Sequence, residues 1–198
     1  MNKKLKLLEK YVAQSNNRIS HYQPDKIIKV KDKMQKNYTY MLSAPYGKNF
    51  HKEFKPQLIP KQILSLGAFE GKYLNDCVKE FPKSWYTSAL KHNKLSPDKA
   101  DSSVNCFKIK SRLSLNEWKR RKWIPIAKGD RDVRGWFQWY CRYYIGRRVP
   151  HIDEIQIKRW KSFRRHVGQI IHNCKRKNLS CRPKQRQALL QWAYTPFI

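Results

Sequence analysis

Apolar residues recur at helical spacing over most of the second half of the chain. The longest periodic segment runs from about Ile152 to Lys177 and predicts one long amphipathic helix. Its apolar face holds Ile152, Trp160, Phe163, Val167, Ile170, Ile171 and Cys174. Its opposite face is basic and holds Lys158, Lys161, Arg164, Arg165, His172, Lys175 and Arg176. We expect the apolar face to pack on the body of the protein and the basic face to point outward.

A second helix is predicted between Asp130 and Arg148, with Asp130 or Asp132 capping its start and Gly146 near its end. On a helical wheel, its aromatic residues cover roughly half of the circumference. These are Trp136, Phe137, Trp139, Tyr140, Tyr143 and Tyr144. A helix this apolar is buried on most sides, so other elements should pack around it. The polar stripe opposite the rings should then be the part that faces a partner. It holds Arg131, Arg134, Gln138 and Arg142.

Shorter elements complete a mainly α prediction. Residues 73–80 and 84–91 read as short helices, and Pro183 is well placed to start a final helix. In that final helix Ala188, Leu189 and Trp192 should face the core, with Lys184 and Arg186 outside. Two further helix starts are signalled at 96–98 and, by a capping box, at 114–117. The sequence therefore predicts one compact helical domain over residues 61–198, built around the central aromatic-rich helix.

Residues 1–60 have a different texture, rich in Lys and broken by four prolines. Leu5, Leu8, Tyr11 and Val12 are spaced for one short amphipathic helix. Residues 26–33 alternate apolar and basic side chains, as an exposed strand or an extended arm would. We expect a basic N-terminal arm, partly extended or disordered. Such an arm either lies along phosphates or is a solvated extension, and both alternatives predict the same composition.

Charge points to an anionic partner. Forty-four Lys and Arg against 14 Asp and Glu give a net charge of +30, well beyond what solubility requires. Nucleic acid, DNA or RNA, is the polyanion that such an excess favours. Acidic protein surfaces, lipid head groups or a generally basic surface without a specific ligand are the alternatives. No run approaches the roughly 18–20 apolar residues of a membrane span, and the N-terminus lacks the apolar core of a secretory signal. We expect an intracellular protein of the nucleus, the cytoplasm or a virion.

Arginine and lysine on the predicted helix faces are the candidate phosphate ligands, because the guanidinium fork suits phosphate oxygens. The candidates are Arg134, Arg142, Arg147, Arg148, Lys158, Lys161, Arg164, Arg165, Lys175, Arg176, Arg182, Lys184 and Arg186. The loop at residues 146–150 would allow a helix-turn-helix-like unit but is not diagnostic of one. Base stacking on the aromatic helix is the alternative, and the crowding of its rings argues against it.

The five cysteines form no dense framework, and in a reducing compartment they should be free thiols. A less favoured alternative is a metal site of Cys141, Cys174, Cys181 and His172, although the usual C-x₂-C spacing is missing. Cys174 lies on the apolar face, where a buried thiol is expected. We predict no cofactor.

Catalytic residues are not evident from spacing. The acids that a nuclease would need for Mg²⁺ are scattered, and several stand at helix-capping positions. They are Glu70, Asp76, Glu80, Asp130, Asp132, Asp153 and Glu154, with His151, His166 and His172 as candidate bases. We therefore expect nucleic-acid binding with weak or no sequence specificity, and lean against an enzyme. One alternative is a structural component of a virion or ribonucleoprotein with a threading basic arm, and a second is a nucleic-acid-processing enzyme.

Several long motifs resemble an uncharacterised conserved family found in plants, fungi, bacteria and large DNA viruses. The motifs cover residues 66–76, 134–148, 156–160, 165–166, 173–174 and 181–194, including RGWFQWYCRYYIGRR and CRPKQRQALLQWAY. The resemblance spans about residues 64–195 and leaves out the Lys-rich first 60. It implies a compact domain and carries no assigned activity.

Overall fold

The computed structural model describes residues 3–14, 25–111, 115–120 and 131–198 and has a mainly α fold, as predicted. Its α-helices are α1 (Lys3–Gln14), α2 (Pro60–Leu66), α3 (Lys83–Lys91), α4 (Leu115–Arg120), α5 (Trp136–Ile145), α6 (Pro150–Phe163), α7 (Arg165–Asn173) and α8 (Pro183–Gln191). Two 3₁₀ turns, η1 (Phe69–Gly71) and η2 (Ser102–Val104), and two strands, β1 (Ile27–Val30) and β2 (Tyr38–Met41), complete the described elements.

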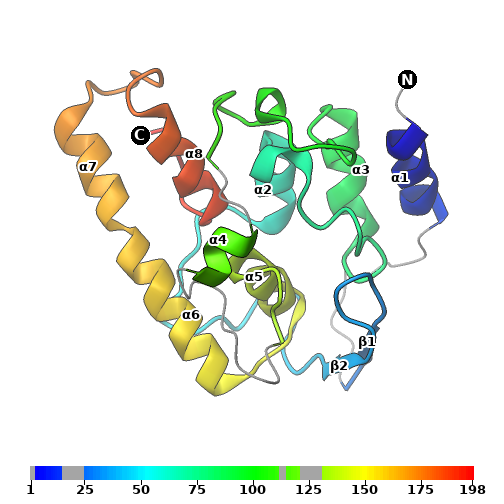
Figure 1. Ribbon diagram of the computed structural model, residues 1–198. Coiled ribbons are helices and arrows are strands. Elements are labelled where there is room, and N and C mark those ends of the chain that lie inside the picture. Colours follow the sequence, from blue (N-terminus) through cyan, green and yellow to red (C-terminus); the bar gives the residue numbers. More distant parts are fainter. Residues whose placement is uncertain (1–2, 15–24, 112–114, 121–130) are drawn as a thin grey trace.

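Helix α5 lies in the interior, with α6 and α7 along one side of the molecule and α1 at the opposite end (Figure 1). All of its residues from Trp136 to Ile145 are buried, which confirms the prediction of a central aromatic helix. Phe54 lies at the centre of the ring cluster, with its centroid 5.4 Å from that of Trp139 and 5.0 Å from that of Trp160. The aromatic rings of α5 therefore form the core and are not a platform for bases.

The predicted long helix is divided in two at Arg164. Helix α6 ends at Phe163 and α7 begins at Arg165, and the two follow one another along the side of the fold (Figure 1). The helical segment ends at Asn173, earlier than Lys177. Ile171 was expected on the apolar face, but its side chain is 66% exposed, whereas that of Ile170 is 1% exposed. The buried stripe is thus narrower than predicted, because one residue of helix turns a side chain through about 100°.

The described part of residues 1–60, which was predicted to be a basic arm, contains a helix and a β-hairpin. Helix α1 confirms the expected amphipathic helix, with Leu8 and Val12 buried against α3. Strand β1 alternates exposed and buried side chains, as expected, and pairs antiparallel with β2 so that Ile28 faces Tyr40. Beyond the hairpin, Leu42, Phe54 and Leu58 are buried in the common core. The predicted boundary at residue 60 therefore does not coincide with a change in packing, because residues 28–58 already supply core side chains.

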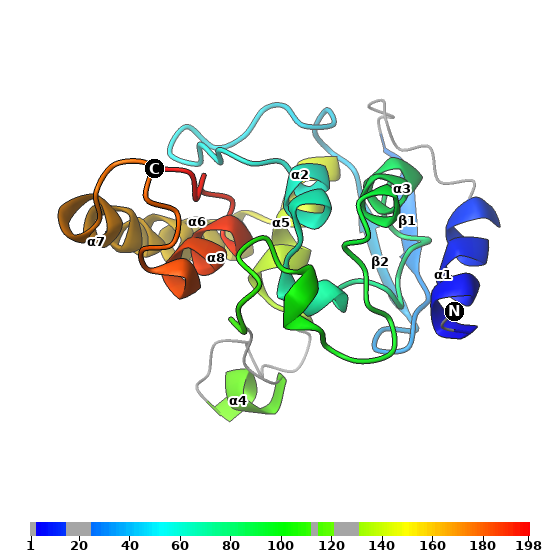
Figure 2. The same ribbon diagram turned by 90° about the horizontal axis from the view of Figure 1, so that it is seen from above.

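Residues 60–111 contain α2, α3 and several turns, and α2 lies next to α5 (Figure 2). Helix α3 confirms the prediction for residues 84–91. The helices predicted for 73–80 and from 96 are wrong, since the first segment forms turns and the second a bend. Leu74 adopts a φ of 62°, a left-handed conformation that an α-helix does not accommodate. Gly67 ends α2 with a φ of 93°, and a Cβ there would lie 2.0 Å from the Val104 carbonyl oxygen, so the close packing at this turn requires glycine.

Helix ends depart from the prediction in one informative case. Gly146 ends α5 as expected and has a φ of 121°. The N-cap of α5 is Gly135 and not Asp132. The capping residues predicted at 114 and 130 lie outside the described residues. Helix α8 begins at Pro183 as predicted. Within the described ranges, no helix is both long and apolar enough to cross a membrane.

Candidate functional site

Arg142, predicted to face a partner, is the cation within α5, and 0% of its surface is exposed. Its Nε and Nη2 atoms donate to the two carboxylate oxygens of Glu80 at 2.6 and 3.1 Å. Nη1 donates to Asp132 Oδ1 at 3.1 Å, and Nη2 also donates to the side-chain oxygen of Gln35 at 2.8 Å. The guanidinium lies 4.9 Å from the ring centroid of Tyr38, near enough for a cation–π contact.

Two neighbouring arginines are held in the same way. Arg147 is 1% exposed and donates to Asp132 Oδ2 at 2.6 Å, so one carboxylate joins Arg142 and Arg147. Arg134 is 5% exposed and pairs with Asp32 at 2.9 Å and with Asp76 at 2.7 Å. We refer to these three arginines and their four carboxylate partners as the buried ion network. The partners are Asp32, Asp76, Glu80 and Asp132.

The electrostatics of the network keep its cations charged. Burial alone would lower the pKa of Arg142, but attraction to the Glu80 and Asp132 carboxylates outweighs it and raises that pKa. Burial raises the pKa of Tyr40, and the negative charge of Glu80 adds to this effect. The Tyr40 hydroxyl accordingly stays protonated and donates to Glu80 Oε1 at 3.0 Å.

Arg134, Arg142 and Arg147 were predicted to contact a ligand, but the structure buries all three and pairs each with a carboxylate. The helical wheel correctly placed Arg142 on the side of α5 away from most of its aromatic rings. Acidic residues from other segments, Glu80 and Asp132, occupy that side of the helix. A guanidinium that is buried and already paired with a carboxylate is not accessible to a phosphate. The sequence analysis did not pair Arg142 with its acidic partners, because Glu80 and Asp132 lie 62 and 10 residues away in sequence.

Two more candidates also have internal roles. Arg186 is 0% exposed and donates to the backbone carbonyl oxygens of Cys181, Pro196 and Ile198 at 2.8, 2.6 and 2.9 Å, so it ties the C-terminus to α8. Arg148 is half-buried, lies 3.8 Å from the Tyr143 ring centroid and donates to the Lys48 carbonyl oxygen at 2.9 Å. Burial lowers the pKa of both guanidinium groups.

The remaining candidates are exposed and follow α6, α7 and the start of α8. We call them the basic face. Its members are Lys158, Lys161, Arg164, Arg165, Lys175, Arg176, Arg182 and Lys184. The first turn of α8 lies against α7, since Gln185 donates to the Gln169 side-chain oxygen at 2.6 Å. At the edge of this face, the Lys161 ammonium forms an ion pair with the Glu53 carboxylate at 2.5 Å. Lys177, which is also exposed, was overlooked although it lies in the same sequence run.

Carboxylates are scarce around the basic face. Residues 150–198 contain two acids, Asp153 and Glu154. Asp153 is buried and accepts hydrogen bonds from Trp139 Nε1 and the Val149 amide, both at 2.8 Å. Burial raises the pKa of its carboxyl despite those donors. Four further acids pair with arginines in the buried ion network. The excess of lysine and arginine over acidic residues is therefore found at the protein surface.

The predicted metal set is not assembled. Cys174 and Cys181 form a disulfide, which corrects the expectation of free thiols and removes both as thiolate ligands. Cys141 is buried in α5, and burial raises the pKa of its thiol.

Among the described residues, Asp32, Cys77 and Glu80 do bring potential ligand atoms within 4.8 Å of one another. Both of these carboxylates already accept hydrogen bonds from Arg134 or Arg142. Burial also raises the pKa of the Cys77 thiol, which opposes formation of a thiolate. This cluster therefore does not favour a cation.

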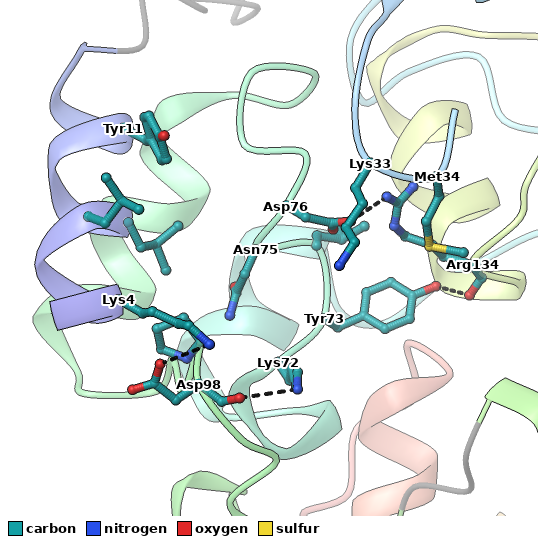
Figure 3. A pocket seen from close by; sticks show the side chains of 14 residues that line it. Lys4, Tyr11, Lys33, Met34, Lys72, Tyr73, Asn75, Asp76, Asp98 and Arg134 are labelled. Atoms are coloured by element: carbon teal, nitrogen blue, oxygen red, sulfur yellow. Dashed lines mark hydrogen bonds and ion pairs between the residues drawn. The ribbon is translucent and has the colours of Figure 1, made fainter. Parts of the chain in front are cut away.

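A cavity of about 470 Å³ lies between α1, the hairpin turn and residues 72–76 (Figure 3). Asp98 lies 3.6 Å from the Lys4 ammonium, and its carbonyl oxygen accepts from Lys72 at 3.3 Å. Arg134 lies at the back, paired with Asp76 as described above. The cavity thus combines apolar walls with charges that mostly pair with one another. It does not bring together a set of reactive groups.

The candidate catalytic residues are dispersed. Glu80, Asp76 and Asp132 belong to the buried ion network, and Asp153 is bound by donors from α5 and the start of α6. His166 packs on Phe163 with a ring separation of 4.5 Å, and its Nδ1 lies 3.1 Å from Gln169 Oε1. These placements indicate structural roles. Comparison with known proteins adds no assignment: no family model, curated protein or solved structure matches the chain.

Proposed function

We propose that the protein binds nucleic acid through the basic face, with weak or no sequence specificity. The observation that carries the proposal is the single sign of this exposed surface. The eight exposed cations of the basic face and the exposed Lys177 follow α6, α7 and the start of α8, while Glu154 is the one exposed acid in residues 150–198. An ordinary solvated helix mixes both signs, whereas a long face of one sign is typical of a surface that meets a polyanion.

The chemistry of the face favours phosphate contacts over base recognition. Lysine and arginine on the outside of a helix reach phosphate oxygens, and such contacts carry no sequence information. The aromatic rings that would stack on bases are buried in the core. The proposal therefore rests on fewer residues than the sequence suggested, since Arg134, Arg142, Arg147 and Arg186 support the fold and Arg148 is largely engaged with backbone.

Binding to labelled duplex DNA, single-stranded DNA and RNA at several salt concentrations tests the proposal. The triple variant Lys158→Gln, Arg165→Gln, Arg176→Gln should bind more weakly. It should also reduce the slope of log K against log salt by about 0.9 for each lost phosphate contact on duplex DNA. A matched control removes three exposed cations far from the face: Lys10→Gln, Lys29→Gln, Lys91→Gln.

The control should retain most of the affinity and nearly all of the salt slope, because α1, β1 and α3 lie away from α6 and α7 (Figure 2). Equal losses in both triple variants would show that only net charge matters and would reject the face as the site. Weak binding by the unmodified protein with little dependence on salt would reject nucleic acid as the partner.

A further inference from the structure

Gly168 stands in the middle of α7 without a local reason. Its position is exposed, and a Cβ built there would meet no atom within 4 Å. Gly47, Gly67, Gly71 and Gly146 differ, because each adopts a positive φ and lies against neighbouring atoms. Glycine is among the poorest residues inside a helix, and here neither backbone conformation nor packing demands it. The missing side chain therefore leaves the backbone of α7 open to close approach by another molecule.

The surroundings of Gly168 are charged and exposed. On a helix, residues three and four positions away lie on the same face. Those positions are Arg164 and Arg165 on one side and Ile171 and His172 on the other, and all four are exposed. No acid occurs between Glu154 and the end of the sequence. Gly168 is therefore a notch in the basic face, with two guanidinium groups on one side of it.

We infer that a sugar–phosphate backbone crosses α7 at Gly168. This inference rests on the proposed function and specifies which part of the basic face the nucleic acid touches most closely. A glycine lets another backbone approach a helix more closely than any other residue allows. Arg164 and Arg165 bind phosphates on one side of the crossing, and the imidazole N–H of His172 donates on the other. The exposed Ile171 side chain, at 66% exposure, contacts the sugars.

Substitution of Gly168 separates this role from folding. Gly168→Ala and Gly168→Leu place better helix formers in α7 without changing charge, so the melting temperature should rise, by about 2–4 °C for alanine. Affinity for duplex or single-stranded DNA should nevertheless fall, more for leucine than for alanine and on the order of tenfold for leucine, because the side chain fills the notch. The salt slope should stay close to that of the unmodified protein while the strand still reaches the arginines.

Thr87→Leu is a matched control, because it adds leucine at an exposed helical position of α3. It should leave affinity unchanged. If the unmodified protein binds DNA and Arg165→Gln weakens binding, but Gly168→Leu binds as tightly as the unmodified protein, the crossing at Gly168 is rejected and the proposed function stands. If the unmodified protein binds DNA no better than it binds polyglutamate, both the proposed function and the crossing are rejected.

Discussion

Arg142 and Glu80 form a two-point ion pair in the interior, with Nε–Oε1 and Nη2–Oε2 distances of 2.6 and 3.1 Å. Their side chains are 0% and 3% exposed. The pair joins α5 to the turn that precedes α3. Arg142, predicted to face a ligand, thus connects two parts of the fold, and its contribution to stability can be measured.

Removing one partner of this pair should destabilise the fold strongly. Arg142→Gln leaves the Glu80 and Asp132 carboxylates short of donors, and breaking a buried ion pair costs about 3–5 kcal/mol. Equilibrium unfolding in urea, followed by tryptophan fluorescence, measures the loss. Arg165→Gln on the exposed basic face is the control and should change stability by no more than about 0.5 kcal/mol. Similar stabilities for the two variants would contradict the buried placement of Arg142.

Phe54 tests whether the N-terminal region belongs to the core. Its ring contacts Trp139, Tyr140, Tyr143 and Trp160 at centroid distances of 5.0 to 5.6 Å. Phe54→Ala should therefore reduce the free energy of unfolding by about 3–5 kcal/mol. Phe197→Ala removes a phenylalanine that is 49% exposed and should cost much less. If Phe54→Ala were no more harmful than Phe197→Ala, residues before 60 would act as an arm after all.

Thiol counting tests the Cys174–Cys181 disulfide. Protein purified without reductant and then denatured should titrate three thiols per chain, those of Cys77, Cys106 and Cys141. After reduction and removal of the reductant, the count should rise to the five cysteines of the sequence. The paired Cys174→Ser, Cys181→Ser variant should lose about 2–3 kcal/mol of stability, as expected for a short closed loop. Five thiols before reduction would contradict the bond.

Asp32 should make stability depend on pH in the acid range. Burial acts to raise the pKa of Asp32, but hydrogen bonds from the Arg134 guanidinium and the Gln35 and Met34 amides outweigh it and hold that pKa below 3.8. A depressed pKa stabilises the folded state above the ordinary value, and this contribution is lost as pH falls through the folded value.

The stability gap between the unmodified protein and Asp32→Asn should therefore be full at neutral pH and shrink below about pH 4. Urea unfolding from about pH 2 to 6 measures it. Asp25→Asn, at an exposed position, is the control and should change stability by no more than about 0.5 kcal/mol. A gap for Asp32→Asn that widened toward low pH would contradict the direction of the shift.

By itself, the sequence determined the elements whose apolar spacing is long and regular. The aromatic density of residues 136–145 required a buried helix. The alternation at 26–33 was compatible with strand β1 or an extended arm, and the periodicity of 152–177 predicted the helical region that the structure divides into α6 and α7. The exposure of Lys158 and Arg165 also followed from that periodicity, because residues opposite a buried stripe have only solvent to face. Periodicity does not predict whether a residue is exposed when another segment of the chain packs against that side of the helix.

Only the tertiary structure showed that Arg142, Arg147 and Arg134 are buried in ion pairs. Their carboxylate partners come from turns and loops, which have no periodic sequence pattern. It also decided that Phe54 lies at the centre of the core, because an isolated aromatic residue among prolines carries no spacing pattern. Likewise, the spacing of Cys174 and Cys181 is compatible with free thiols, a metal site or a disulfide, and only their proximity across the α7–α8 loop selects the last. Local periodicity determined which side chains turn away from the core, but which of them meet solvent depended on the long-range packing that brings distant charges together.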